Sequence, residues 1–596
     1  MDLTQTPLRG LLPAQPPTVL ELDLSRGILS GAPASPRDAL RALQAPTMRS
    51  IRDGLREAAK DERVAGLVIN IGDCPLTAGQ VDELAELITR FGEHRPTVAH
   101  TSSFGELTNG LFGYRLASHC HQIWLQPSGS VGIQGVALGV TLFRGTLDKV
   151  GVEPEFGQRH EYKTAANQFA AHEVTEPQRE MMQRIADSVL AETVTRVAER
   201  RSLPPEAVRA AVDSAPLTAA EALEHKLIDR IGYRDEVYGW LTENWGKIIP
   251  AAPRPWRPEP DEGPQVRLQY VHRYAKQGFG GAAQQLAARS KPAIAVVGVQ
   301  GGIVTGQSQR SAFGGQQAGA DTVAAQLRAA GRDSGVKAVI LRVDSPGGSY
   351  VASDAIRREV VRLRESGRPV VATMGDVAAS GGYFVSMAAD EIVVNPTTLT
   401  GSIGVLAGKF VTTGLTDRIG LVREELAAGA RARMFSNLET FTDDHWQTLD
   451  RWLDEVYADF TTKAATDRKM PHATLEPLAR GRVWTGADAV QHQLADRLGG
   501  MDTAIDRVCT LAGLDRDDAV LRTGPGFPFL AQLRPAESSE SGHTDTRLAD
   551  DLLAGGPALG TLAGTGGLEA LWRQAAEALG VAAPGVLSLP FVPQLR

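Results

Sequence analysis

The sequence predicts an α/β protein made of two tandem, duplicated domains of repeated β-α units, followed by a flexible C-terminal extension. First, 596 residues exceed what a single hydrophobic core usually serves. Second, two distant segments show the same order of strand-like and helix-like patterns. Third, apolar β-branched runs alternate with amphipathic stretches, which favours a largely parallel sheet in each copy.

The repeat begins at Val64–His100 and at Val336–Thr373. Each segment reads as a buried strand, a Gly/Pro loop, an amphipathic helix, an X-Pro break and a second strand. The match continues in "HQIWLQPSGSVGIQGV" from His121 and "DEIVVNPTTLTGSIGV" from Asp390. The same order of strands, Gly/Pro loops and helices over about a hundred residues argues against a chance similarity of two generic β-α units.

The predicted domains follow this repeat and the composition between its copies. An N-terminal domain covers 1–248, a proline-rich linker and connecting segment covers 249–290, a C-terminal domain covers 291–515, and the extension covers 516–596. The linker prediction rests on six prolines between Ile248 and Gln265 without apolar periodicity. The sequence "LEALWRQAAEALG" in the extension predicts an amphipathic helix that packs on its own protein or, alternatively, makes a peripheral membrane contact.

Composition excludes several classes of protein. A net charge of −8 without a basic tract argues against nucleic acid as a partner. The three cysteines, Cys74, Cys120 and Cys509, are far apart, so neither a disulfide framework nor a structural zinc site is expected. The first residues lack the features of a secretory signal, and no apolar run reaches about 18 residues. We therefore expect a membrane-associated or cytoplasmic protein without signal peptide or transmembrane helix.

Two glycine-rich loops could carry chemistry. "DSPGGS" places Gly347 and Gly348 between a strand and a helix, where a backbone N–H can face a ligand. "AASGG" places Ser380 and Gly381 one β-α unit downstream, also at a helix start. Successive strand-to-helix loops of a parallel sheet lie side by side, so the two could converge. Taken alone, the first motif is more often a simple turn, and Ser380 could be an N-cap.

The two copies differ at these positions. Aligning Pro127 with Pro396 places Leu111 opposite Ser380 and Ile133 opposite Ser402. Only the C-terminal copy therefore offers a serine nucleophile.

The proton acceptor for such a serine is not obvious. The histidines of the C-terminal half lie outside glycine-rich or strand-end settings: His445, His472, His492 and His543. A lysine can act as general base when burial lowers its pKa. Lys163, in "EYKTAANQF", is followed by small and apolar residues, although a single lysine is usually a solvated surface charge.

The motifs "DSPGGS", "MGDVAASGGYFVS", "NPTTLTGSIGV", "RGRVWTGADAV" and "EYKTAANQF" resemble those of the signal peptide peptidases of the SppA type, in the long two-domain form called protease IV. The resemblance covers most of the chain, from about Glu62 to Val508. It implies a Clp/crotonase-like fold in each domain and assembly into a homotetramer or larger ring. It also implies that Ser380 is the nucleophile, that Lys163 is the general base and that Ser402 hydrogen-bonds the lysine. The implied oxyanion hole uses Gly348 and Gly381, beside Gly347.

Together these observations predict a serine endopeptidase with a Ser380–Lys163 dyad, acting without cofactor or metal on signal peptides and other short apolar peptides. One alternative is a crotonase-like acyl-CoA enzyme, which would share the fold but needs no serine–lysine pair. The other is a catalytically silent scaffold that only binds peptides.

Overall fold

The computed structural model describes residues 15–25, 27–29, 46–106, 108–248, 263–274, 291–310, 316–523 and 587–588. They pack as two compact units that do not follow the order of the chain. The first unit combines Met1–Gly135 with Leu190–Ala282, and the second combines Val136–Val189 with Ala283–Arg596. The segment that contains Lys163 therefore packs in the same unit as Ser380. The predicted boundaries of the sequence repeats, 1–248 and 291–515, remain a proposal.

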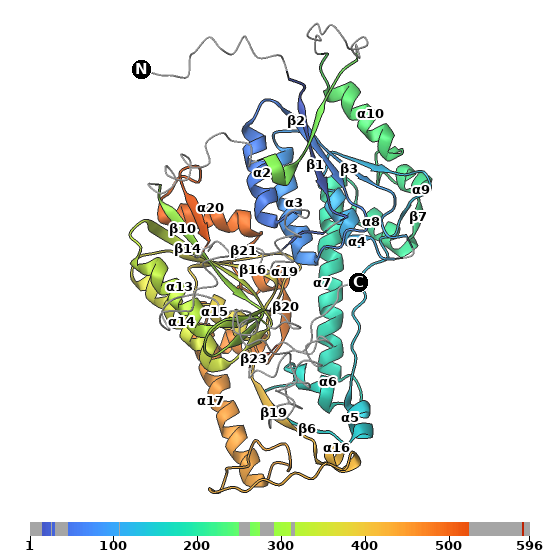
Figure 1. The fold of residues 1–596 in the computed structure, drawn as a ribbon. Coiled ribbons are helices and arrows are strands. Elements are labelled where there is room, and N and C mark those ends of the chain that lie inside the picture. The colour runs from blue at the N-terminus through green and yellow to red at the C-terminus, as the bar shows by residue number, and fades with distance from the viewer. Residues whose placement is uncertain are drawn as a thin grey trace, which may run out of the picture. The chain divides into compact units, whose positions relative to one another are not determined.

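The first unit is built on a parallel six-stranded sheet of order β8-β4-β3-β2-β1-β9 (Figure 1). Its strands are β1 (Thr18–Asp23), β2 (Val64–Asn70), β3 (Thr97–Thr101), β4 (Gln122–Leu125), β8 (Arg230–Ile231) and β9 (Arg267–Tyr270), with a separate pair β5 (Ser130–Val131) and β7 (Leu217–Thr218). Its helices are α2 (Met48–Lys60), α3 (Ala78–Gly92), α4 (Leu111–Ala117), α8 (Pro205–Ser214), α9 (Ala219–Glu224), α10 (Arg234–Trp245) and α11 (Val271–Tyr274). Capping boxes at Thr47 and Thr77 begin α2 and α3.

The second unit is built on an eight-stranded sheet. Its strands are β10 (Ala293–Gln300), β14 (Val336–Ser345), β16 (Val370–Ala379), β17 (Glu391–Val394), β18 (Leu399–Gly401), β20 (Val483–Thr485), β21 (Arg497–Leu498) and β22 (Val520–Thr523). Around it lie α13 (Ala320–Arg332), α14 (Tyr350–Glu365), α15 (Gly381–Ser386), α16 (Thr413–Arg418), α17 (Asp443–Asp467), α18 (His472–Leu475), α19 (Gly486–Gln491), α20 (Met501–Ala512) and the short 3-10 turn η4 (Glu476–Leu478). From the N-terminal half come α5 (Arg144–Val150), β6 (Glu153–Gln158), the 3-10 turn η2 (Thr164–Ala166), α6 (Asn167–Ala170) and the start of α7 (Glu176–Arg201).

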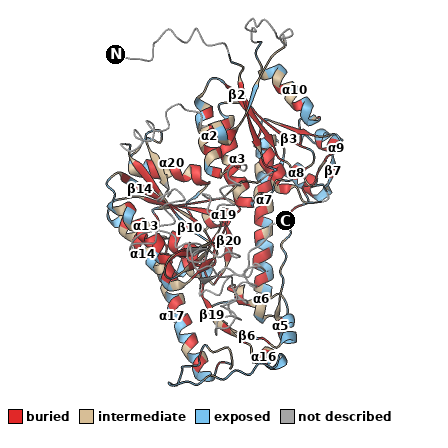
Figure 2. Ribbon diagram, viewed as in Figure 1, coloured by how far each residue is buried: buried red, intermediate tan, exposed pale blue. Residues whose placement is uncertain are grey.

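Both faces of this second sheet are covered. Along β14, Val339, Leu341 and Val343 belong to the large core that includes residues of α13 and α14, whereas Ala338 and Ile340 pack with α20. Such alternation follows from the opposite directions of successive side chains in a strand. Figure 2 shows buried residues along β14 and exposed residues on the outer sides of α13 and α17.

The two units repeat one topology, which confirms the duplication predicted from the sequence. The path β9-β1-β2-β3-β4-β8 of the first corresponds to β22-β10-β14-β16-β17-β21 of the second. Individual hydrogen bonds repeat as well. The Tyr114 hydroxyl donates to the Leu227 carbonyl at 2.8 Å, and the Tyr383 hydroxyl donates to the Leu494 carbonyl at 3.0 Å. The predicted alignment of Leu111 with Ser380 therefore holds in three dimensions, because it also aligns the two tyrosines.

The structure describes only parts of the predicted connecting segment and of the predicted C-terminal extension. β9 lies in the range predicted as a connecting segment, and β22 opens the predicted extension; each pairs with an edge of its sheet. The predicted amphipathic helix lies outside the described residues. Within them, every helix is too short or too polar to cross a membrane, and no group of three or more His, Cys, Asp or Glu side chains is arranged to hold a metal ion.

Candidate active site

A two-stranded antiparallel ladder brings the lysine segment to the second sheet. β6 pairs with β19 (Leu406–Val411) over six residue pairs, from Gln158 opposite Leu406 to Glu153 opposite Val411. The Arg159 N–H extends the ladder by donating to the Val405 carbonyl at 3.0 Å. Because Lys163 follows β6 and Ser402 precedes β19, the ladder fixes these two residues beside each other although they are 239 positions apart.

Ser380 stands between the end of β16 and the start of α15. Its backbone has φ 54° and ψ −112°, a conformation that side-chain-bearing residues rarely adopt. The Ser380 N–H donates to the Gly401 carbonyl at 2.8 Å, and its carbonyl accepts from the Phe384 N–H at 2.8 Å. Strain of this kind costs about 1–3 kcal/mol and is held by the surrounding structure, often where a side chain must be presented for chemistry.

The structure brings Lys163, Ser380 and Ser402 together in a fully buried cluster. The Lys163 Nζ lies 2.8 Å from the Ser380 Oγ, 2.9 Å from the Ser402 Oγ and 3.0 Å from the Ser402 carbonyl oxygen. All three residues are 0% exposed. The lysine is therefore not the solvated surface charge that its residue type usually indicates.

Burial favours the neutral form of this lysine. Desolvation lowers the pKa of the Lys163 amine well below its ordinary value, because an ammonium loses its hydration there. A neutral amine has two N–H donors and one lone pair, which matches its three neighbours. The N–H groups can donate to the two Ser402 oxygens, leaving the lone pair to accept the Ser380 hydroxyl proton. The cluster can thus remove a proton from Ser380 without a histidine.

The glycine loop of "DSPGGS" lies against the residue that follows Ser380. Gly347 and Gly348 form the short strand β15, with φ of 110° and 153°. A Cβ placed on Gly381 would meet the Gly348 nitrogen at 3.1 Å and the Gly347 Cα at 3.2 Å. The two loops therefore converge, as the sequence predicts. The Gly347 N–H donates to the Ser345 Oγ at 3.2 Å, so Gly348 and Gly381 are the better oxyanion donors.

The described histidines of the C-terminal half contact residues other than Ser380, Ser402 and Lys163. The His445 Nδ1 accepts from the Thr442 N–H at the start of α17, and the His472 Nε2 lies 3.0 Å from the Thr461 Oγ1. The His492 ring packs against Trp484. His543 lies outside the described residues.

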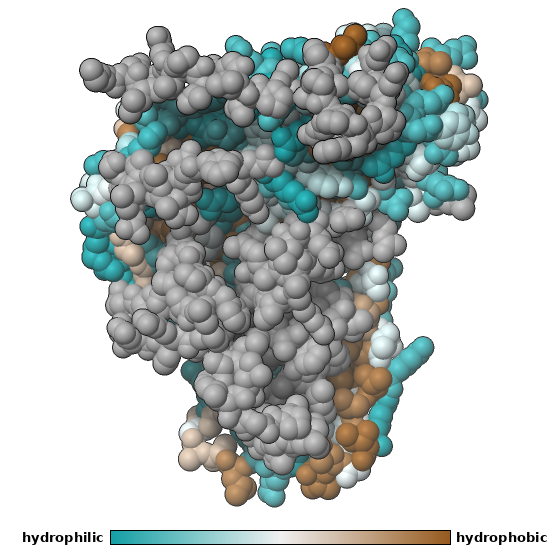
Figure 3. Space-filling view, turned by 45° about the horizontal axis from the view of Figure 1, so that its top comes forward, coloured by the Kyte–Doolittle hydropathy of each residue, from teal (hydrophilic) through white to brown (hydrophobic). Residues whose placement is uncertain are grey.

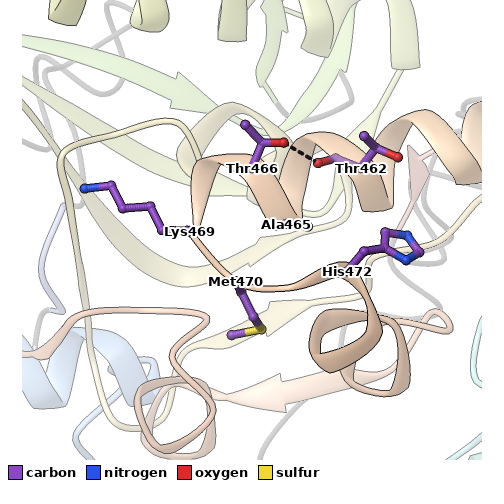
Figure 4. Close-up of a pocket in the computed structure, with 6 residues that line it drawn as sticks. All are labelled: Thr462, Ala465, Thr466, Lys469, Met470 and His472. Carbon is purple, nitrogen blue, oxygen red and sulfur yellow. Dashed lines mark hydrogen bonds between the residues drawn. The ribbon is translucent and has the colours of Figure 1, made fainter.

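A shallow pocket at the end of α17 contains none of the predicted site residues (Figure 4). Its lining is Thr462, Ala465, Thr466, Lys469, Met470 and His472. These side chains hold no paired carboxylates and no nucleophile with an adjacent base, so we assign no chemistry to it.

Comparisons with known proteins find a matching family model, relatives of similar sequence and solved structures that align with part of the chain. The model of Peptidase family S49 matches residues 102–246 and 362–515. The chain is 30% identical over 464 residues to the chloroplastic serine protease SPPA of Arabidopsis thaliana, spanning 77% of this chain but only 65% of that protein. It is 29% identical over 481 residues to Protease 4 of Salmonella typhi, spanning 79% and 73% of the two chains. Among solved structures, a ClpP1 mutant from Listeria monocytogenes aligns over 37% of this chain and 99% of its own, at 13% identity and a TM-score of 0.24.

Proposed function

Because this chain belongs to peptidase family S49, we propose that it is a serine endopeptidase in which Ser380 is the nucleophile and Lys163 the general base. The observation that carries the proposal is the 2.8 Å contact between the Lys163 Nζ and the Ser380 Oγ inside a fully buried cluster. Burial lowers the pKa of the Lys163 amine, and a neutral amine can accept the serine proton, which a charged exposed lysine cannot do.

The proposed reaction proceeds in two steps. The Ser380 Oγ attacks the peptide carbonyl carbon while its proton moves to the Lys163 Nζ. The resulting oxyanion accepts hydrogen bonds from the Gly348 and Gly381 N–H groups. Collapse breaks the C–N bond, and the Lys163 ammonium protonates the leaving amine. Water then gives a proton to the same lysine and attacks the ester carbonyl carbon. The C–O bond to Ser380 breaks, the Lys163 ammonium returns the proton to the Ser380 Oγ, and the acid product is released.

Ser402 has a distinct role in this proposal. When Lys163 becomes an ammonium in the transition state, the Ser402 Oγ and carbonyl oxygen both accept hydrogen bonds from a charged donor. Hydrogen bonds to charged groups are stronger than those between neutral groups. Ser402 therefore stabilises the transition state more than the resting enzyme, which is the requirement for an effect on kcat.

We propose short apolar peptides, released signal peptides among them, as the substrates. Support comes from an antiparallel pairing beside the nucleophile, where β23 (Leu587–Ser588) lies along β15, with Gly348 opposite Leu587 and Gly347 opposite Ser588. The edge of β15 can thus accept an extended segment by main-chain pairing, a common mode of peptide recognition. The sequence around Leu587, "GVLSLPFV", is uncharged and mostly apolar.

We also propose a homotetramer or larger ring. The segment between α16 and α17 exposes large apolar side chains, with Val422 95%, Leu426 92% and Phe435 62% exposed. Figure 3 shows apolar atoms at the lower end of the view, where α16 and β6 lie in Figure 1. Exposed apolar patches commonly mark interaction surfaces. Light scattering should show that Val422→Asp with Leu426→Asp lowers the molecular mass of the particle; an unchanged mass would contradict the use of this surface.

A fluorophosphonate probe tests the catalytic assignment. Intact wild-type protein should gain one adduct, located on Ser380 by peptide mass mapping, and should hydrolyse a fluorogenic apolar peptide. Ser380→Ala and Lys163→Ala should lose labelling and hydrolysis while keeping the wild-type circular dichroism spectrum. Labelling at a different serine, or hydrolysis that survives in the Lys163 variant, would contradict the dyad. An acyl-CoA enzyme of crotonase type would show neither reaction.

A further inference from the structure

One loop touches both the lysine and Ser402, yet the chemistry above gives it no role. It runs from Ala479 to Arg482, between η4 and β20. Gly481 is buried in this loop with φ 81°. A Cβ placed on Gly481 would lie 2.5 Å from the N, Cα and Cβ atoms of Lys163. The backbone of the loop therefore lies directly on the backbone of Lys163, and only glycine fits there.

A second glycine confines the lysine side chain further along. A Cβ on Gly404 would lie 3.2 Å from the Lys163 Cδ and 2.8 Å from the Gly481 Cα. The Gly481 N–H donates to the Ile403 carbonyl at 2.8 Å, which holds the two glycines together. A free lysine side chain has four rotatable bonds and loses rotamer freedom when it is ordered. Close packing against the two glycines means that much of this ordering is complete before substrate binds.

The same loop also fixes the partners of the lysine. The Arg482 carbonyl accepts the Ser402 N–H at 2.7 Å. The Arg482 guanidinium donates to the Glu180 Oε1 at 2.7 Å, and the Glu180 Oε2 accepts from the Tyr162 hydroxyl at 2.7 Å. Tyr162 immediately precedes Lys163 in the chain. The loop residue next to Gly481 thus holds Ser402 directly and, through Glu180, the residue that precedes Lys163.

From these contacts we propose that Gly481 is a positioning residue, which sets the Lys163 Nζ within reach of the Ser380 Oγ by allowing the loop to pack on the lysine backbone. The inference rests on the proposed function, since it concerns the same base. A methyl group at position 481 must push Lys163 away from the loop. The amine then moves out of hydrogen-bond range of the Ser380 Oγ and becomes less buried, while Ser380 and β15 stay in place. The rate of proton transfer should fall, and the substrate should still bind.

The test is Gly481→Ala in the full chain, with Gly367→Ala as the matched control. Gly367 has φ 79°, nearly the same backbone strain, but a Cβ there meets nothing within 4 Å. For each variant we would measure kcat and KM with a fluorogenic apolar peptide, the fluorophosphonate labelling rate of Ser380 against pH, and the thermal unfolding transition.

For Gly481→Ala we expect a loss in kcat of about 10²-fold or more, the cost of misplacing a catalytic group by about 1 Å, with little change in KM. The inflection of the labelling rate should move to higher pH, because a less buried lysine has a more ordinary pKa. Gly367→Ala should keep the wild-type kcat and inflection. A folded Gly481→Ala variant with unchanged kcat, or with a lower kcat but the wild-type inflection, would overturn the proposal.

Two further arms keep the outcomes separate. If Gly481→Ala shows no cooperative unfolding, the same measurements on Gly404→Ala decide by the same criteria, since its methyl also meets the lysine side chain. If neither variant folds while Gly367→Ala does, the glycines serve the fold and not the base, and the proposal fails. Failure of the proposed function is distinguishable, because wild-type protein would then not be labelled at Ser380.

Discussion

Replacing Ser402 by alanine removes one acceptor of the Lys163 amine and leaves the other. The Ser402 Oγ lies 2.9 Å from the Lys163 Nζ, and the carbonyl oxygen at 3.0 Å is unaffected by the change. A hydrogen bond to a charged group contributes about 1.5–3 kcal/mol, and about 1.4 kcal/mol corresponds to a tenfold change in rate. If the bond reaches this strength only when the amine becomes an ammonium, kcat should fall between about 10-fold and about 150-fold.

The assay is steady-state hydrolysis of a fluorogenic apolar peptide, with kcat and KM determined separately. KM should change little, because Ser402 contacts the lysine amine and is not part of β15, the strand proposed to pair with the peptide. Ser386→Ala is the matched control: Ser386 is equally buried and its Oγ donates to the Gly382 carbonyl at 2.8 Å, without touching Lys163. A decrease in kcat of less than about 3-fold for Ser402→Ala, or an equal decrease for the control, would refute the assigned role.

Three further predictions test other parts of the account. Between the lowered pKa of Lys163 and the ordinary lysine pKa of about 10.4, unfolding of the wild type takes up a proton. The stability of Lys163→Met relative to wild type should therefore rise by about 1.4 kcal/mol for each unit that the pH falls in this range. A difference in urea midpoint that does not vary between pH 7 and pH 10 would contradict this prediction. Gly348→Ala should abolish peptide hydrolysis, since its Cβ would lie 2.1 Å from the Ile303 carbonyl oxygen and must displace β15; wild-type kcat in this variant would exclude the Gly348 N–H from the oxyanion hole. A synthetic peptide of sequence GVLSLPFV should act as a substrate or competitive inhibitor and should raise the apparent KM of the fluorogenic peptide. A control peptide of the same length with aspartate at alternate positions should not.

The duplication and the convergence of the two glycine-rich loops could be predicted from the sequence, because both follow from patterns carried by neighbouring residues. The β-α pattern of Val64–His100 and Val336–Thr373 is carried by neighbouring residues, and the structure confirms it in the matching strand orders. The convergence of "DSPGGS" with "AASGG" follows from parallel-sheet geometry alone. The start of α15 directly after Ser380 agrees with the expected helix start.

The place of the lysine could not be predicted in this way. Lys163 reaches Ser380 through the ladder between β6 and β19, whose sequences "EPEFGQ" and "LAGKFV" contain no sign that they pair. Pairing between segments so distant depends on the packed core, and periodicity within one segment does not report it. For this reason the sequence suggests a base contributed by the N-terminal half, whereas the structure packs Val136–Val189 into the second unit.

The backbone conformations of the site were also outside the reach of sequence reasoning. Ser380 and Ser402 both have positive φ, of 54° and 51°, although serine does not favour it. A pattern-based prediction places glycine at such positions and therefore misses them. Gly481 illustrates the reverse case. The sequence motif "RGRVWTGADAV" contains this glycine, but the reason for it is visible only in the structure, where a Cβ at position 481 would lie 2.5 Å from Lys163.

If neutral Lys163 is the base, the rate of fluorophosphonate labelling at Ser380 must depend on the ionisation of this lysine. The rate should rise with pH to a plateau, with an inflection below the ordinary lysine value of about 10.4, because burial lowers the pKa of Lys163. Lys163→Ala should remove the inflection and nearly all labelling, and Lys163→Arg should do the same because a guanidinium stays charged. A profile with its inflection near about pH 6.5, the ordinary histidine value, that persists in Lys163→Ala would contradict the account.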